Sequence, residues 1–144
     1  MYKHILIATD GSELAGKAVK IGLALARHLK AKVTVVTATE PWAAMATGAG
    51  AFAFPVEEYE KSAAENAARI LGEVSAAAKQ KDVVCETVRV NDFPAEGIID
   101  TAKAKGCDLI VMASHGRRGL ARALLGSQAT RVLTLSTVPV LICR

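Results

Sequence analysis

Two short polar segments of this 144-residue sequence combine glycine with hydroxyl, carboxylate or imidazole side chains. Residues 9–12 read Thr-Asp-Gly-Ser, and residues 114–119 read Ser-His-Gly-Arg-Arg-Gly, followed later by Gly126 and Ser127. Glycine lets backbone amides approach a ligand closely, and the free N–H groups at the start of a helix attract phosphate. The second segment therefore has the components of an anion site. The alternative is that these glycines only end helices or strands and that the arginines lie on a solvent-exposed face, since loose glycine spacings are common.

The distribution of charge points to the same part of the chain. The net charge is +4, but residues 1–108 carry 13 Lys and Arg against 14 Asp and Glu. Residues 109–144 carry no acid and five arginines, which are Arg117, Arg118, Arg122, Arg131 and Arg144. This pattern favours a small phosphate compound as the ligand. Nucleic acid is disfavoured because the arginines have no adjacent aromatic platform and the overall excess is small.

The polar segments do not form a recognisable catalytic set. His115 lies in the glycine-rich segment, but no Ser-His-acid set or pair of carboxylates stands beside it in the sequence. A Walker loop needs a lysine before the Ser or Thr, whereas Ser127 follows Gly126 directly. The GxGxxG pattern of dinucleotide-binding folds is absent after the first apolar run. We therefore assign no catalytic residue.

Short apolar runs alternate with helical patterns along the chain. Strands are predicted at residues 4–8, 33–38, 83–90, 107–112 and 138–143. Helices are predicted after residue 12, capped by Asp10 or Ser12, and over residues 56–81, 95–105 and 127–136. This alternation predicts an α/β fold with a parallel sheet and helices on both faces. We see no repeat or boundary, so we expect one domain over residues 1–144.

Both polar segments follow a predicted strand, and that position matters. Open parallel sheets bind ligands at the carboxyl ends of their strands, near the point where the strand order reverses. Asp10 can cap the following helix and contact a ligand at the same time, because a cap needs only one oxygen. Residues 40–55 are long for a loop. We expect Trp42, Phe52 and Phe54 to pack locally there, with a cover over the ligand as the alternative.

Three stretches of the sequence together resemble one known family. The segment Ala113-Ser114-His115-Gly116, followed after nine residues by Gly126 and Ser127, resembles the nucleotide loop of the universal stress protein family. Residues 4–12 resemble that family's first strand and turn, and residues 138–142 resemble its last strand. The matches fall at both ends of the chain and in the correct order, so the resemblance covers the whole sequence.

The resemblance implies a Rossmann-like sheet of five parallel strands in the order 3-2-1-4-5, as in adenine nucleotide alpha hydrolases. It also implies a site for ATP or AMP. Asp10 would contact the ribose or a bridging Mg²⁺ or Mn²⁺ ion, and Thr9 and the backbone of Ala38 would border the adenine. The residues that the resemblance places on the phosphate and ribose side are Ser114, His115, Gly116, Gly126, Ser127 and the amide of Gln128. Arg117 is a further candidate that would clamp a phosphate, with a position in solvent as the alternative.

One position departs from the family pattern, because its first glycine is Ala113 here. The methyl group would prevent binding only if the backbone needs a positive φ or if the sugar lies against this position. We expect nucleotide binding to persist. The alternative is a nucleotide-free, dimerising interaction protein of the same fold. Slow ATP hydrolysis is compatible with the site, but no set of residues demands it.

The last predicted strand, residues 138–143, is apolar on both faces. Such a strand at a sheet edge invites pairing with another chain. The resemblance implies a homodimer across it, although Pro139 removes one backbone donor.

The remaining features indicate the compartment. Charge interrupts the first ten residues too soon for a signal peptide, and no uncharged stretch reaches the ~18 apolar residues of a membrane span. Cys85, Cys107 and Cys143 are odd in number and far apart, as expected for buried free thiols in a reducing cytosol rather than metal ligands. We expect a cytoplasmic stress-response protein with no membrane partner.

Overall fold

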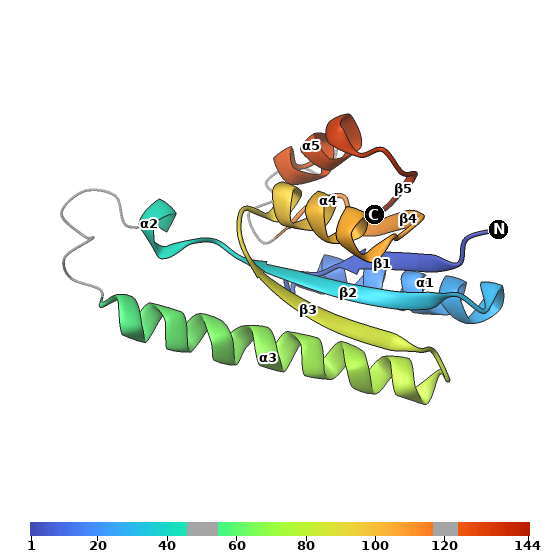
Figure 1. The fold of residues 1–144 in the computed structure, drawn as a ribbon, viewed down its shortest axis with the longest axis horizontal. Helices are drawn as coiled ribbons and strands as arrows, with labels where there is room; N and C mark the ends of the chain where they lie inside the picture. Colours follow the sequence, from blue (N-terminus) through green and yellow to red (C-terminus); the bar gives the residue numbers. More distant parts are fainter. Residues whose placement is uncertain (46–54, 117–123) are drawn as a thin grey trace.

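The computed structural model describes residues 1–45, 55–116 and 124–144. Its centre is a parallel sheet in the order β3-β2-β1-β4-β5, which confirms the predicted order. In the middle of the sheet β1 and β4 are neighbours, with Leu6 paired to Ile110 (Figure 1). The strand order reverses there, since β2 and β3 lie to one side and β5 to the other. The strands are β1 (His4–Ala8), β2 (Lys32–Thr39), β3 (Cys85–Asn91), β4 (Leu109–Ala113) and β5 (Val140–Cys143).

Helices cover both faces of the sheet, as the alternating pattern predicts. Helices α1 (Glu13–Leu29) and α3 (Val56–Gln80) lie on one face, and α4 (Pro94–Lys105) and α5 (Ser127–Leu135) lie on the other (Figure 1). Successive residues of β1 belong alternately to the two hydrophobic cores, one on each face of the sheet. Ile5 and Ile7 belong to the core under α1 and α3, whereas Leu6 belongs to the core under α4 and α5.

The helix boundaries follow from local hydrogen bonds. Of the two candidate caps for α1, Ser12 is the cap, since its hydroxyl accepts from the Ala15 N–H at 3.2 Å. Asp10 instead accepts from the Ser12 N–H at 2.9 Å. Residues 42–45 form the short helix α2 (Trp42–Met45) where the sequence predicts only a loop. Phe52 and Phe54 lie outside the described residues.

Three strands begin two residues later than predicted, because the N–H group of the first predicted residue bonds back to the segment before the strand. The Val83 N–H bonds back to the Ala78 carbonyl, and the Cys107 N–H bonds back to the Ala102 carbonyl. Both donors therefore end a preceding helix instead of joining the sheet. Before β5, the Val138 N–H bonds to the hydroxyl of Ser136, which follows the last residue of α5, and Pro139 has no donor to contribute.

Coverage of the sheet also differs between strands. Every residue of β1 and β4 is buried, but β3 lies at an edge with Glu86 and Arg89 exposed.

The three cysteines are free thiols, and burial raises the pKa of each. Cys107 and Cys143 are buried as expected, whereas Cys85 is only half-buried. Within the described ranges, no helix has the length and apolarity needed to cross a bilayer.

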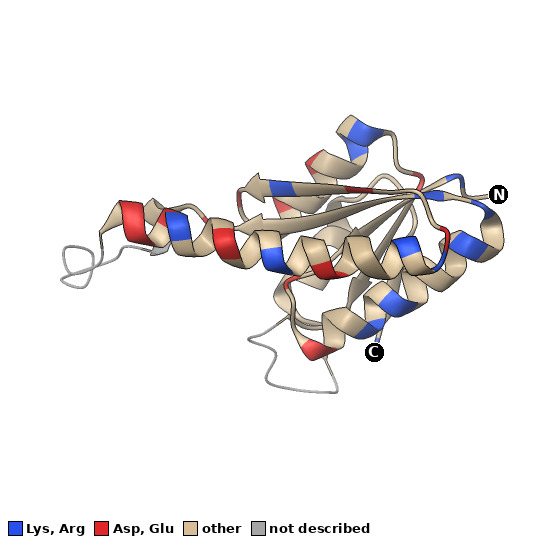
Figure 2. Ribbon diagram, turned by 90° about the horizontal axis from the view of Figure 1, so that it is seen from below, with Lys and Arg blue, Asp and Glu red and all other residues tan. Residues whose placement is uncertain are grey.

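Acidic and basic side chains lie at opposite ends of three helices. The first turns of α1, α3 and α4 contain acidic residues and their last turns contain basic residues, which complements each helix dipole. Figure 2 shows Lys and Arg gathered at the end of the molecule where the N-terminus lies. Helix α5 differs, since its first turn holds no acid. The start of α5 therefore keeps its partial positive charge uncompensated by a side chain of its own first turn.

Candidate functional site

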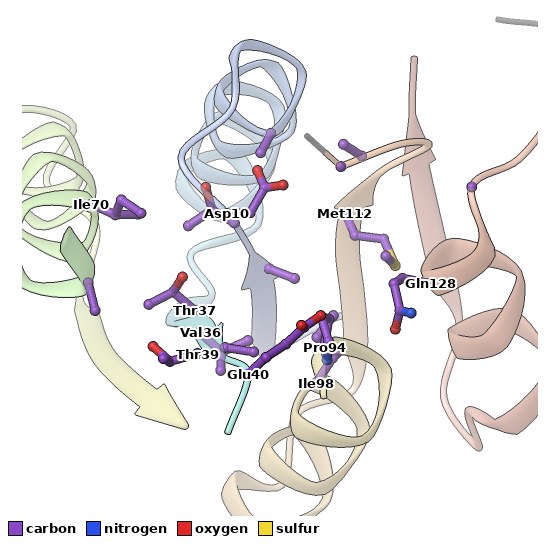
Figure 3. A pocket seen from close by; sticks show the side chains of 18 of the residues that line it. Asp10, Val36, Thr37, Thr39, Glu40, Ile70, Pro94, Ile98, Met112 and Gln128 are labelled. Atoms are coloured by element: carbon purple, nitrogen blue, oxygen red, sulfur yellow. The ribbon is translucent and has the colours of Figure 1, made fainter. Parts of the chain in front are cut away.

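A cavity of about 650 Å³ opens at the carboxyl ends of β1, β2 and β4, where the strand order reverses (Figure 3). The starts of α4 and α5 and the first half of α3 complete its wall. Arg117 lies outside the described residues. The predicted site residues that line the cavity are Thr9, Asp10, Ala38, Ala113, Ser114, His115, Gly116, Gly126, Ser127 and Gln128.

The turn after β1 is held in place by backbone bonds. The Thr9 N–H donates to the Val36 carbonyl at 3.0 Å, which ties the turn to β2. The Thr9 hydroxyl accepts from the Gly11 N–H at 3.2 Å. Together with the bond from Ser12 to the Asp10 carboxylate, these contacts fix the turn at the cavity rim. The Asp10 side chain is therefore ordered before any ligand arrives.

The glycine-rich segment closes on itself at its base. The Ser114 N–H continues the sheet by donating to the Cys143 carbonyl at 2.8 Å, and the Ser114 carbonyl accepts from the Gly126 N–H at 2.8 Å. A Cβ atom at Gly126 would lie 3.0 Å from the Ser114 carbonyl oxygen and 3.3 Å from the His115 Cα. Only glycine fits this approach without displacing backbone.

The two predicted polar segments meet at Gly116. A Cβ atom there would lie 2.9 Å from the Asp10 Oδ2 atom. The two segments therefore approach closely, because they follow the neighbouring strands β1 and β4. Beside them, the Ser114 hydroxyl and the His115 Nδ1 atom lie 3.1 Å apart and share a hydrogen bond.

The start of α5 lines the cavity with Gly126, Ser127 and Gln128. Its N-cap residue, Gly126, has no side chain to bond the first N–H groups. The side chain of Gln128 is already engaged, because its Oε1 atom accepts from the Ala95 N–H at 3.0 Å. The amides of the first α5 turn and the Ser127 hydroxyl are thus donors that this wall offers to an anion.

Ala113, the departure from the family pattern, causes no backbone strain. It is the last residue of β4, and the non-glycine residues with positive φ in the described chain are Lys30 and Asp82. Its side chain is 8% exposed and packs in the core on the α1 side of the sheet. The Ala113 methyl group therefore does not prevent binding through backbone strain.

Helix α3 supplies one wall of the cavity that was not predicted from the sequence. Its Tyr59 hydroxyl donates to the Glu40 carbonyl at 2.6 Å, and burial, with the carboxylates of Glu40 and Glu60 nearby, raises the pKa of Tyr59. The helical spacing is visible in the sequence, but nothing local indicates that this face borders the site. The lining residues of α3 are Tyr59, Ser62, Ala63, Asn66, Ala67 and Ile70.

The described residues do not hold a metal ion by themselves. In the ranges that the structure describes, no three or more His, Cys, Asp and Glu side chains cluster closely enough to ligate one. Asp10 and Glu40 are the carboxylates among the cavity-lining residues. A divalent cation here would need further oxygen ligands, such as those of a phosphate group or water.

Comparison with known proteins agrees with this architecture. The model of the universal stress protein family matches residues 1–144. Universal stress protein YxiE of Bacillus subtilis is 33% identical, with both chains covered completely. Universal stress protein MJ0577 of Methanocaldococcus jannaschii is 31% identical over all of this chain and 96% of its own.

Solved structures give the same result. The structure of MJ0577 superposes with a TM-score of 0.84 over 99% of this chain and 96% of that one. A universal stress protein in complex with cAMP superposes with a TM-score of 0.73 at 26% identity, over 99% of this chain and 97% of that one. With a family model matching from end to end and full-length relatives of 31% and 33% identity, this chain belongs to the universal stress protein family.

Proposed function

We propose that this protein binds an adenine nucleotide, ATP or AMP, in the cavity at the carboxyl edge of the sheet. The observation that carries the proposal is the close approach of the two polar segments, which both line the cavity at the point where the strand order reverses. A related universal stress protein of the same fold forms a complex with cAMP, which is also an adenine nucleotide. The cavity volume falls within the usual range for small-ligand sites.

Each wall of the cavity suits one part of the nucleotide. The amides of Gly126, Ser127 and Gln128 would hold phosphate oxygens at the start of α5. Asp10 would accept hydrogen bonds from the ribose hydroxyls, since a carboxylate offers only acceptors. Thr9 and the Ala38 backbone would border the adenine at the ends of β1 and β2. Alternatively, Asp10 would bind an Mg²⁺ or Mn²⁺ ion that enters with ATP.

The direct test is to purify the protein without added nucleotide, denature it, and separate the released small molecules by chromatography. Stoichiometric ATP or AMP supports the proposal. Protein that releases none is then titrated with Mg-ATP in a calorimeter. Protein that carries no nucleotide and also shows neither binding heat nor a thermal shift at millimolar Mg-ATP contradicts the proposal. That result would favour the nucleotide-free interaction protein.

A substitution at Asp10 tests the ribose contact. Asp10→Ala should weaken Mg-ATP binding roughly tenfold to one-hundredfold, the usual scale for losing hydrogen bonds to a charged group. The matched control is Asp100→Ala, which removes an exposed carboxylate from α4 away from the cavity lining. An unchanged affinity in Asp10→Ala would show that Asp10 serves only the turn.

We also propose that the protein forms a homodimer across β5 and the chain before it, residues 138–143, and acts in the cytoplasmic stress response. β5 is an edge strand with Leu141 38% exposed, and the neighbouring helix α5 exposes Leu133 and Leu135. Exposed apolar groups on an edge strand favour pairing with a second chain.

Sedimentation velocity tests the dimer. Leu141→Glu should convert a dimer to monomer by placing two like charges in the interface. Val84→Glu is the control, because Val84 is a 75% exposed aliphatic residue just before β3, at the opposite edge of the sheet. A wild-type monomer, or a dimer that survives Leu141→Glu, would contradict pairing through this strand.

A further inference from the structure

The first turn of α4 has no cap of its own. Its N-cap residue, Phe93, makes no side-chain cap bond, and Pro94 at the first helical position has no N–H. The first N–H of this helix therefore belongs to Ala95, a fully buried residue. A buried N–H at a helix start needs an acceptor from elsewhere, because an unbonded one is costly.

The acceptor comes from α5. The Gln128 Oε1 atom accepts from the Ala95 N–H at 3.0 Å, across 33 positions of sequence. The same two helices meet a second time where the Arg131 Nε atom donates to the Glu96 Oε1 atom at 2.6 Å. That second contact is exposed, whereas the Gln128 contact is part-buried. Water competes less with the Gln128 bond, so it is the stronger tie between the helices.

This tie joins two walls of the cavity. Gln128 belongs to the wall formed by the start of α5, together with Gly126 and Ser127. Pro94 and Ile98 of α4 belong to the adjacent wall, and Figure 3 shows them on the neighbouring helix. The Gln128 side chain therefore links the start of α5 to the adjacent wall, in addition to the bond between the Gly126 N–H and the Ser114 carbonyl.

We propose that Gln128 is a positioning residue, whose side chain holds the start of α5 against α4 so that the α5 amides are fixed where phosphate binds. This inference rests on the adenine-nucleotide site proposed above and assigns a role to a side chain that need not touch the ligand. A group fixed before binding loses less freedom when the ligand arrives. We expect the gain in affinity for the phosphates and not for the nucleoside, because in the proposed site the α5 amides bind the phosphates.

The test compares ATP with adenosine. Gln128→Met keeps the length of the side chain and removes the acceptor. By calorimetry, Mg-ATP should bind about fivefold more weakly, the scale of one net hydrogen bond, while adenosine affinity changes less than about twofold. A residue that only stabilises the fold would weaken both ligands equally or neither.

A second substitution separates positioning from capping. Phe93→Ser supplies α4 with a hydroxyl acceptor at its own N-cap, where the extended backbone already suits a cap. Combined with Gln128→Met, it should restore the melting temperature but leave the ratio of ATP to adenosine affinity low. Arg131→Ala is the control, since it cuts the exposed link between the same helices and should leave that ratio unchanged.

The outcomes are distinguishable. Recovery of both the melting temperature and the affinity ratio in the double variant would show that Gln128 is only a cap, and would overturn the inference. Equal losses for ATP and adenosine in Gln128→Met would overturn it as well. Wild-type protein that binds neither ligand would instead contradict the nucleotide site itself, and the inference with it.

Discussion

The two ends of the parallel strands carry polar residues in opposite arrangements. At the amino end, the Asp108 carboxylate accepts from the Lys3 N–H at 2.9 Å and the His4 N–H at 3.0 Å. The His4 ring bonds the Thr34 hydroxyl at 2.8 Å. At the carboxyl end, polar residues surround a cavity of about 650 Å³. Polar groups at the amino end bind one another and stabilise the fold, whereas those at the carboxyl end enclose space for a ligand.

The direction of the chain explains this difference. In a parallel sheet with returning helices, α1, α4 and α5 begin near the carboxyl ends of the strands and end near the amino ends. Partial positive charge therefore collects around the cavity, and partial negative charge collects at the other end. The basic last turns of α1, α3 and α4 compensate the negative end within the protein. The acidic first turns of the same three helices compensate their positive ends, whereas the start of α5 has no acid in its first turn and is left to attract an anion.

The strongest test of this comparison removes His4, which is 6% exposed. His4→Ala should lower the free energy of unfolding by about 2–4 kcal/mol, since it leaves a cavity and deprives the Thr34 hydroxyl of its partner. Urea denaturation measures this loss. Mg-ATP affinity measured by calorimetry should stay within about twofold of wild type, because the contact lies at the opposite end of the strands.

The matched control for His4→Ala is His28→Ala, at an exposed position of α1. It should leave both the stability and the affinity near wild type. A large loss of ATP affinity in His4→Ala, measured where the variant is folded, would show that the two ends of the sheet are coupled.

Lowering the pH should reduce the free energy of unfolding less than His4→Ala does, because the His4 side chain stays in place and only its protonation changes. Burial lowers the pKa of His4 from 6.5, and Lys32 adds to this effect, while Asp108 and Glu86 oppose it. Below pH 6.5 the unfolded chain therefore binds more protons at this residue than the folded chain. Stability should fall as the pH decreases from 6.5 toward the folded pKa, and be regained as the pH rises.

The measurement for the pH effect is the free energy of unfolding of wild type and His4→Gln across this range. Glutamine can still bond Thr34 but does not titrate, so the difference between the two proteins isolates the His4 contribution. Parallel curves for the two proteins would contradict it.

The smallest effect is expected at Ala113, within the carboxyl end itself. Ala113→Gly should change Mg-ATP affinity less than about twofold, because alanine causes no backbone strain there. Stability should fall by about 0.5–1 kcal/mol, the cost of glycine inside a strand. A marked gain in ATP affinity would instead mean that the methyl group presses on the sugar.

Local patterns predicted most of the fold. Residues 4–8 were predicted as a strand and form β1, and the helix predicted over residues 95–105 is α4, which begins one residue earlier and ends at Lys105. The errors are short and fall where a residue bonds outside its own element. Val83 and Cys107 look like strand residues because they are apolar, yet their N–H groups complete the preceding helices. Residue type does not show which acceptor an N–H will find.

The candidate site was predictable only in part. Glycine spacing and family resemblance indicated the segments at Asp10, Gly116 and Gly126, which all line the cavity. The α3 wall was missed, because its residues are ordinary helix residues whose partner surface lies elsewhere in the sequence. The acidic residues at helix starts and basic residues at helix ends are also visible in the sequence, but their common orientation is not.

The sequence by itself determined the alternation of strands and helices, the glycine positions of the binding segment and the absence of acid after Asp108. These properties depend on residues a few positions apart. Only the tertiary structure decided that Gln128 would cap α4, 33 positions away, and that Asp108 would bond the N–H of His4, 104 positions away. Such pairs form because the sheet brings distant segments to one edge, where each buried donor must find whichever acceptor the packing places beside it.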